Sequence, residues 1–380
     1  MSTAVQRVTS HAGDPAWLVT GYDTIRRLLV DPRLGTTHPD PERASHYSES
    51  VIFGKPRPSS ATERQEHAYM RRLLGRSFSA RRLAVLRPRV QDLVDGLLDE
   101  LARKTPPVDL HDAISFPLPA LVICELLGVP YADREDFRRW SDDAGDMTDQ
   151  ARSLAGLGAL WQYIGQLVQK KLEQPAEDVL SDLVAAHREN PAAFPLDQVV
   201  ELGAGLLFAG HETTVAAIDK GVLLLLTSPA QRAALQRDPA LVPAAVEEIL
   251  RISVPLPIPD TGRATGLPRW TNADVVIDGV TIPAGDLVLL ELQDANHEEG
   301  VFGTPQEFDV TRADNPHLTF GHGAHFCVGA PLARMELQAL FGTLFARFPT
   351  LELAVPVKEL RLRSNLLTGG LDALPVTWHP

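Results

Sequence analysis

Apolar residues recur at three- and four-residue spacing over most of the chain, which is the pattern of helices that bury one face. The longest such stretch runs from about 196 to 227 and stops at Ser228-Pro229. At about 1.5 Å per residue this helix would be roughly 45 Å long, enough to cross a whole domain. Shorter helices are predicted over residues 22–30, 63–74, 82–104, 113–127, 133–144, 151–172, 179–187, 231–237, 241–252 and 330–348.

Strand patterns are short and concentrate toward the two ends of the chain. Val275–Ile277 and Val280–Ile282 flank Asp278-Gly279, a dipeptide that favours a type I′ turn, so these residues are predicted to form a hairpin. Residues 31–62 are rich in Pro, Gly, Ser and Asp and are predicted to be loops. Further strands are expected at 17–20, 286–292, 352–355 and 374–378.

These patterns predict a mainly α fold with a smaller β-rich lobe. The helical body would comprise about 63–252 and 327–348, and the strand-rich parts about 14–20, 270–292 and 350–380. Because neither part can bury a core alone, a single domain over 1–380 is expected. Little sequence precedes the first predicted strand, so the N-terminus is expected to be short.

Composition narrows the class of protein. The chain has 380 residues, 44% hydrophobic and 22% charged, as in a soluble globular protein. Its net charge of −13 argues against nucleic-acid binding, which needs a basic face. Polar residues interrupt the longest apolar stretch, so no membrane-spanning segment is expected. Residues 1–16 lack a signal peptide's apolar run, and Cys124 and Cys327 are the two cysteines, so a cytoplasmic protein is expected. It is also expected to be a monomer.

Cys327 lies in a glycine-rich loop that leads into a predicted helix. Pro331 suits the first turn of that helix, so the loop ends at a helix N-terminus. The positive end of the helix, together with free N–H groups around Gly329, should stabilise a thiolate at Cys327. Small residues on either side would allow a large flat group to approach. Cys124, in contrast, lies in an apolar helical run and is predicted to pack in the core.

The cysteine loop carries a complete family signature. Phe320, Gly323, His325, Cys327 and Gly329 match FxxGxHxCxG, the haem-binding loop of the cytochrome P450 family. The chain resembles the soluble bacterial members of this family from about residue 14 to its end. The resemblance implies the cytochrome P450 fold, haem b as cofactor with the Cys327 thiolate as iron ligand, and O2 as co-substrate.

A polar group interrupts the middle of the long helix at Gly210-His211-Glu212-Thr213-Thr214. The Thr213 hydroxyl can reach the carbonyl of Ala209 four residues earlier, and with Gly210 this would bend or open the helix. The stretch resembles the family's A/G-G-x-D/E-T motif. By that resemblance Glu212 and Thr213 are the catalytic acid–alcohol pair that delivers protons during oxygen activation, and Gly210 lies at the cofactor.

Three further groups resemble structural and haem-binding motifs of the family. Glu248 and Arg251 match ExxR and, with Arg312, would form a buried charge cluster that braces the cysteine loop. His67 and Arg71 match HxxxR. Arg269 matches R-x-A-x-x-D-x-x-x-x-G with Thr271 in place of Ala, and Arg263 is the weaker choice. The resemblance implies that His67, Arg71, Arg269 and His325 bind the haem propionates and that Phe320 contacts the cofactor.

The resemblance implies a haem-thiolate monooxygenase that inserts one oxygen atom from O2 into an apolar small molecule, in secondary-metabolite biosynthesis. Ferredoxin and ferredoxin reductase would supply electrons, docking near Arg72, Arg76 and Arg334. A peroxide-driven haem enzyme and a non-catalytic haem-binding protein are the alternatives, and the Glu212–Thr213 pair argues against both. The predicted substrate-pocket residues are Leu206, Ala209, Val254, Ile258 and Leu366.

Overall fold

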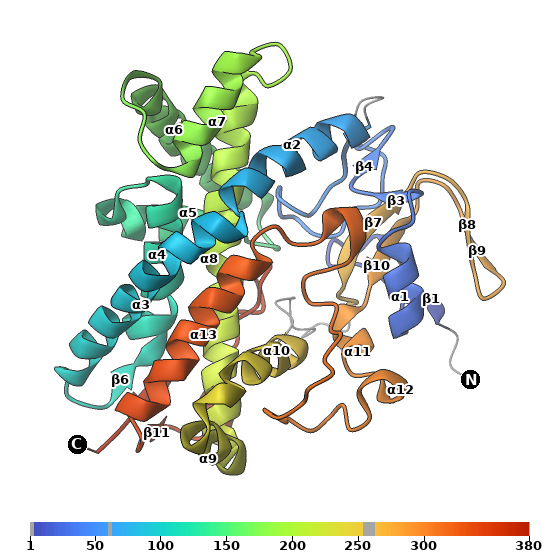
Figure 1. Cartoon of the computed structure of the whole chain (residues 1–380). Helices are drawn as coiled ribbons and strands as arrows, with labels where there is room; N and C mark the ends of the chain where they lie inside the picture. The colour runs from blue at the N-terminus through green and yellow to red at the C-terminus, as the bar shows by residue number, and fades with distance from the viewer. Residues whose placement is uncertain (1–3, 60–62, 254–262, 380) are drawn as a thin grey trace.

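The long predicted helix is present and runs through the helical part of the molecule (Figure 1). The computed structural model describes residues 4–59, 63–253 and 263–379. Helix α8 spans Leu196–Thr227, as predicted, and most of its side chains are buried. Other helices pack around it, so the polar group at its centre lies inside the protein.

Most other predicted helices are confirmed to within a few residues. The predicted helix 113–127 is divided: His111–Ser115 form a π-helical turn, η1, and the α-helix begins at Pro117, since proline suits a first turn. The helices are α1 (Tyr22–Leu28), α2 (Glu63–Ser77), α3 (Ala80–Ala102), α4 (Pro117–Leu127), α5 (Arg134–Ala144), α6 (Gln150–Glu173), α7 (Val179–Glu189), α9 (Pro229–Arg237), α10 (Val242–Ile252), α11 (Leu292–Ala295), α12 (Glu299–Phe302) and α13 (Ala330–Arg347).

The β-rich lobe lies to one side of the helical body, at the right of Figure 1. Its main sheet has the strand order β1-β2-β10-β7-β3, and the predicted hairpin is β8–β9. Positive φ angles at Asp278 and Gly279 fit the predicted type I′ turn. The strands are β1 (Val5–Thr9), β2 (Pro15–Val19), β3 (Leu34–Gly35), β4 (Thr37–His38), β5 (Arg57–Pro58), β6 (Val108–Asp109), β7 (Leu267–Thr271), β8 (Val275–Ile277), β9 (Val280–Ile282), β10 (Leu287–Leu290), β11 (Glu352–Leu353) and β12 (Pro375–Thr377).

Two strand predictions were incomplete. The residues before β2 form β1, which pairs antiparallel with β2, so the segment that precedes the first predicted strand is itself part of the sheet. The region predicted as loops, 31–62, contains the two-residue strands β3, β4 and β5. These short strands exist because distant partners pair with them, which local composition does not report.

Buried apolar side chains form a large cluster in the helical body and a separate one in the β-rich lobe. A third, smaller cluster joins the two lobes through Tyr47, Met147 and Trp270. The single-domain interpretation stays a prediction. None of the helices in the described part of the chain combines the length and the apolar run that a membrane crossing requires.

Candidate active site

Cys327 is exposed, whereas Cys124 is buried in the core as predicted. The backbone N–H of Cys327 donates to the carbonyl oxygen of Phe320 at 2.9 Å, which closes the loop. The short turn η4, Gly323–His325, lies between these two residues, and α13 begins three residues after the cysteine. The loop therefore presents its cysteine at the start of a helix, as the sequence indicated.

Glycine is required in this loop for conformation and for space. Gly321 and Gly323 have φ angles of 71° and 73°, in the left-handed region that glycine adopts at little cost. A Cβ at Gly323 would lie 2.5 Å from Cγ1 of Val30 on the neighbouring α1 segment. At Gly321 the nearest atom would be 3.7 Å away, so only the backbone requirement applies there.

The Cys327 sulfur accepts hydrogen bonds from the backbone N–H groups of Gly329 and Ala330, as predicted. These hydrogen bonds do not decide its pKa. Although Cys327 is exposed, the protein atoms packed around its thiol displace water and raise its pKa above the ordinary value, and these N–H groups, Arg71 and Arg334 oppose that rise only in part. The N–H groups at the helix terminus favour the thiolate, but they do not by themselves offset the loss of hydration. A metal ion bound by the sulfur would supply the missing stabilisation, because coordinating thiols are deprotonated.

Four predicted propionate ligands come together beside this loop. The rings of His67, on α2, and His325 lie with centroids 4.2 Å apart. Burial lowers the pKa of His325 to about 4, and the neighbouring charges of His67, Arg269 and Arg71 lower it further. Residues separated by some two hundred positions thus form one cationic cluster.

The cluster suits an anionic ligand. Burial lowers the pKa of Arg269 to about 10, and its Nη1 donates to the carbonyl of Pro268 at 2.8 Å. Among the described residues no carboxylate forms an ion pair with Arg269 or Arg71. Arg263, the weaker candidate, is exposed and donates to the carbonyl of His11. Two carboxylates of a flat cofactor would satisfy cations held in this way.

The structure adds Arg57 to this cluster, which the sequence analysis missed. Arg57 lies on β5, where its Nη2 donates to Oγ1 of Thr36 at 3.2 Å, and its charge contributes to the lowered pKa of His325. No sequence motif identifies Arg57, because only the short pairing of β4 with β5 brings it to the cationic cluster.

Within α8, the Thr213 hydroxyl donates to the carbonyl of Ala209 at 3.1 Å, as predicted. Gly205 and Ala209 are exposed and Thr213 is half-buried, although most of the helix is buried. These three residues are four apart and share one face. The centre of α8 therefore presents an accessible stripe of small side chains ending in a hydroxyl.

Gly210 and Glu212 lie away from that stripe. A Cβ at Gly210 would come within 2.6 Å of Cδ1 of Ile123, so this glycine allows close packing against α4. Helix α8 is continuous through Gly210, so the local opening of the helix is not seen and stays a prediction. The predicted contact of Gly210 with the cofactor also stays a prediction. Glu212 is buried, with Oε1 3.1 Å from Nδ1 of His211. Burial acts to raise the pKa of Glu212, but His211, Arg363 and His111 outweigh it and lower the pKa.

The three residues predicted to brace the loop form a buried cluster. Arg251 donates to both carboxylate oxygens of Glu248 at 2.8 Å, and both side chains are fully buried. Nε of Arg312 donates to Glu248 at 3.0 Å. Arg251 also donates to the carbonyls of Asn296 and Pro305, which tie the segment before the cysteine loop to α10.

The predicted pocket residues differ in their solvent exposure. Ala209 is on the accessible stripe, whereas Leu206 and Leu366 are buried. Val254 and Ile258 lie outside the described residues.

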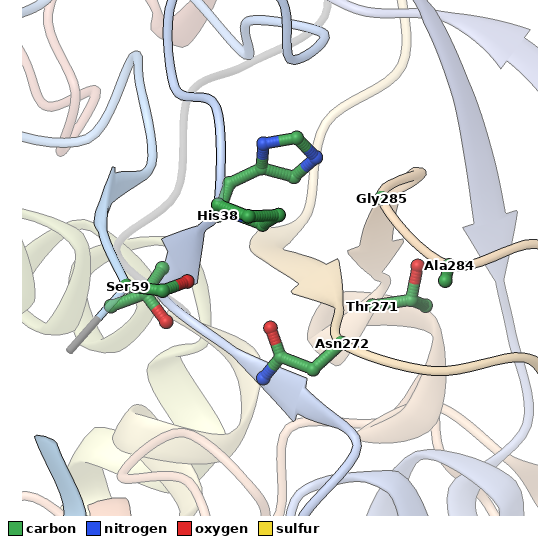
Figure 2. Close-up of a pocket in the computed structure, with 8 residues that line it drawn as sticks. His38, Ser59, Thr271, Asn272, Ala284 and Gly285 are labelled. Carbon is green, nitrogen blue, oxygen red and sulfur yellow. The ribbon is translucent and has the colours of Figure 1, made fainter. Parts of the chain in front are cut away.

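Of two surface hollows, one lies apart from these groups and the other borders the cysteine loop. One, of about 440 Å³, is lined by His38, Ser59, Thr271, Asn272 and Gly285 (Figure 2). It contains no predicted site residue, and Nδ1 of His38 is engaged by Asp40. The other, of about 560 Å³, lies where α1 meets the cysteine loop and is lined by Asp23, Arg26, Arg27, Val30 and His322.

Comparison with known proteins decides the family. The family model described as cytochrome P450 matches residues 159–365. Pentalenolactone synthase of Streptomyces exfoliatus is 42% identical over 370 residues, covering 97% of this chain and 91% of that protein. The chain belongs to the cytochrome P450 family. Vitamin D(3) 25-hydroxylase of Pseudonocardia autotrophica is 41% identical over 374 residues, covering 96% of this chain and 89% of that protein.

Solved structures give the same result for the fold. A mycinamicin VIII methyl hydroxylase of Micromonospora griseorubida, solved with mycinamicin VIII bound, superimposes with a TM-score of 0.87 and 36% identity, covering 98% of this chain and 93% of that one. The cytochrome P450 fold is confirmed, and the chain is a cytochrome P450 monooxygenase. Family membership implies haem-thiolate iron and the use of dioxygen. The cysteine loop and the cationic cluster have the donor chemistry that such a cofactor requires.

Proposed function

We propose that this cytochrome P450 inserts one oxygen atom from O2 into an apolar small organic molecule, as a step of secondary-metabolite biosynthesis. The observation that carries the proposal is that Cys327 lies beside a cationic cluster in which Arg71 and Arg269 form no ion pair with a carboxylate of the described residues. Cys327 would ligate the iron of haem b, and His67, Arg71, Arg269 and His325 would hold its propionates.

When bound, the haem supplies the iron at which dioxygen is reduced and cleaved. The chain's own residues would control protons and access. Thr213 presents its hydroxyl on the accessible stripe of α8, and the adjacent buried Glu212 would pass protons toward it. Gly205 and Ala209 carry no bulky side chain on that stripe, so a substrate can approach closely.

The proposed substrate is apolar because the predicted pocket residues are all apolar. Leu206 and Leu366 are proposed to lie behind the pocket wall, and Val254 and Ile258 stay predicted lining residues. The relatives differ in what their names specify: pentalenolactone, vitamin D(3) and mycinamicin VIII. These names specify different organic small molecules, and we infer that broad class of substrate.

Ferredoxin and ferredoxin reductase are the proposed electron donors to a cytoplasmic monomer. Arg72 and Arg76 are exposed on α2 and would attract an acidic partner. Arg334 contributes little to such a patch, which corrects the prediction, because Glu247 accepts from its Nε and Nη2 at 2.7 and 2.8 Å. Arg26 and Arg27, beside the cysteine loop, take its place.

The proposal is tested by turnover under isotopically labelled dioxygen. The purified enzyme, a surrogate ferredoxin and its reductase would be supplied with apolar compounds that shift the haem spin state. We expect each product molecule to carry one labelled oxygen atom. A product without label, or oxidation that proceeds with peroxide but not with dioxygen and electrons, would contradict the proposal.

A further inference from the structure

A buried carboxyl group at the end of β10 faces the contact between the two lobes. The N–H of Glu291 continues the sheet by donating to the carbonyl of Val19 at 3.0 Å. Because side chains alternate along a strand, Glu291 points to the same face as Leu287 and Leu289, which belong to the small apolar cluster that joins the lobes. Glu291 is only 9% exposed, and a glutamate is rarely buried to this extent without a partner of opposite charge.

No basic side chain meets this carboxyl group. In the part of the chain that the structure describes, Glu291 forms no ion pair, and the sequence of the undescribed stretch 254–262 contains no Lys, Arg or His. Oε1 of Glu291 accepts from the backbone N–H of Gln293 at 3.1 Å, which caps α11. Oε2 accepts from the Thr265 hydroxyl at 3.3 Å. Neutral donors therefore hold a carboxyl group that lacks a counter-charge.

The pKa of Glu291 reflects this lack of a counter-charge. Burial, together with the nearby Asp294 carboxylate, raises the pKa of Glu291 to about 7. The N–H groups of Gln293 and Asp294 and the Thr265 hydroxyl oppose the rise only in part. A cation placed beside the carboxyl group would favour its charged form, so the position suits a ligand that brings a positive charge.

Two buried hydroxyl groups that have no hydrogen-bond partner among the described residues lie near this carboxyl group. One belongs to Tyr47: burial raises the pKa of Tyr47, and the charge of Glu291 adds to that rise, so the two groups are close. The other belongs to Ser253. Nε2 of Gln293 donates to the carbonyl of Ile252, the residue before Ser253, at 3.2 Å. We call Glu291, Tyr47 and Ser253 the junction site.

The unpartnered hydroxyl groups are a second sign that the junction site is built for a ligand. Native proteins almost always satisfy buried hydroxyl groups, because a buried polar atom without a partner is costly. Tyr47 is fully buried and Ser253 is 2% exposed, so bulk water does not serve either group. Both oxygens can accept a hydrogen bond from a ligand.

The junction site borders the predicted substrate pocket at two points. Ser253 directly precedes Val254, and Leu367, which packs against the joining cluster, directly follows Leu366. Val254 and Leu366 are both predicted pocket residues. A ligand group in the junction site would therefore belong to a molecule whose remainder lies in the pocket.

The chain after Leu366 leads from the junction site to α8. A Cβ at Gly370 would lie 3.9 Å from Cβ of Ala216, which is one turn after Thr213 on α8. Glu291 keeps a small accessible area, so its carboxyl group is not sealed off. A molecule held at the junction site can thus extend toward the accessible stripe of α8.

We propose that the junction site binds a primary ammonium group carried by an otherwise apolar substrate. The inference deepens the proposed function and rests on it. An ammonium group has three N–H donors, and the site offers the Glu291 carboxylate and the hydroxyl oxygens of Tyr47 and Ser253 as acceptors. A neutral hydroxyl group on the substrate would leave the carboxylate without a counter-charge. Glu291 is therefore a specificity-determining residue, which contacts the substrate away from the position that is oxidised.

The first test compares two probes that differ in one group, dodecylamine and 1-dodecanol, by equilibrium dialysis against the haem-loaded protein. At about pH 8 we expect the wild type to bind the amine about tenfold more tightly, because hydrogen bonds between charged groups are stronger than those between neutral groups. Equal affinities overturn the proposal. An amine complex whose Soret band shows nitrogen ligation of the iron also overturns it, since the amine would then lie on the haem.

The second test removes the charge. Glu291→Gln keeps an oxygen that can accept from the capping N–H of Gln293, and it should abolish the advantage of the amine while leaving the affinity for the alcohol unchanged. Glu299→Gln is the matched control, because Glu299 is exposed on α12 in the same part of the chain. The control should keep the preference for the amine. A preference that survives Glu291→Gln overturns the proposal.

The preference should also depend on pH. Dodecylamine stays protonated through neutrality, whereas lowering the pH from about 8 to about 6 protonates Glu291. Asp294 on α11 and Tyr47 are the other titratable groups that face Glu291. The advantage of the amine should therefore shrink over this range in the wild type and in Glu299→Gln. An advantage that stays constant over this range overturns the proposal.

Tyr47→Phe and Ser253→Ala test the hydroxyl groups and keep the proposal open to refutation if Glu291→Gln does not fold. Each variant should weaken binding of the amine several-fold and binding of the alcohol less. Unchanged binding of the amine in both variants overturns the proposed acceptors. Dialysis does not require turnover, so the two proposals fail separately. Products without labelled oxygen would refute the proposed function, whereas equal affinities for the two probes would refute the junction site.

Discussion

Gly323→Ala should destabilise the cysteine loop, by an amount that can be divided into two causes. The φ of 73° places any other residue in the left-handed region, which costs about 1–2 kcal/mol. The added Cβ would also lie 2.5 Å from Cγ1 of Val30, a clash that costs about 1–3 kcal/mol unless the Val30 side chain rotates away. The sum, roughly 2–5 kcal/mol, is a large share of a typical stability.

Gly321→Ala is the matched control, because its φ is 71° but its Cβ would have 3.7 Å of clearance. It should show the backbone cost alone. Val30→Ala, at a 53% exposed position, should cost little alone and should recover the steric part in the Gly323→Ala background. The free energies of unfolding in urea and the haem content of the four variants would be compared. Equal losses for the two glycine variants, or no recovery with Val30→Ala, would refute the reasoning.

Three further predictions concern buried charges and the helix hydroxyl. Glu248→Gln leaves two buried arginines without their carboxylate and should cost about 3–5 kcal/mol in urea unfolding; a loss below about 1 kcal/mol would contradict the bracing role. Burial acts to raise the pKa of Glu247, but His317 and Arg334 lower it to about 2. Its contribution, roughly 1–2 kcal/mol after solvent screening, is present above its unfolded pKa of about 4.3, so the stability gap between wild type and Glu247→Gln should be constant above about pH 5 and should narrow below it, and a gap that stays constant down to about pH 3 would contradict this. Thr213→Ala should release several-fold more peroxide per oxygen consumed, whereas Thr227→Ala, which removes a similar hydroxyl-to-carbonyl bond at the helix end, should not.

The features that could be predicted from the sequence are those that depend on the spacing of residues close together in the chain. The limits of α8 follow from uninterrupted apolar periodicity and a terminal Ser-Pro, and the cysteine loop follows from its glycines. The start of α4 was missed because η1 has the same apolar content as an α-helical turn, and only the π-helical hydrogen bonding distinguishes them. Strands β1 and β3 depend on partners far away in the chain.

Site residues could be predicted where they belong to a sequence motif. They were missed where only a tertiary contact brings them to the site. Arg57 joins the cationic cluster through a two-residue strand, without any spacing that marks it. Tyr47 and Glu291 meet across more than two hundred residues. Arg334 was given to the docking face from its charge alone, and the structure shows why charge is insufficient: Glu247, on the neighbouring helix, neutralises it.

The most direct test of the central claim is the absorption spectrum of the reduced protein under carbon monoxide, for wild type and Cys327→Ser. The account predicts a strongly red-shifted Soret band in the wild type, because a thiolate donates to the iron, and its loss in Cys327→Ser with haem still bound through the cationic cluster. A red-shifted band that persists in Cys327→Ser, or a wild-type spectrum typical of histidine ligation, would contradict the assignment of Cys327 as the iron ligand.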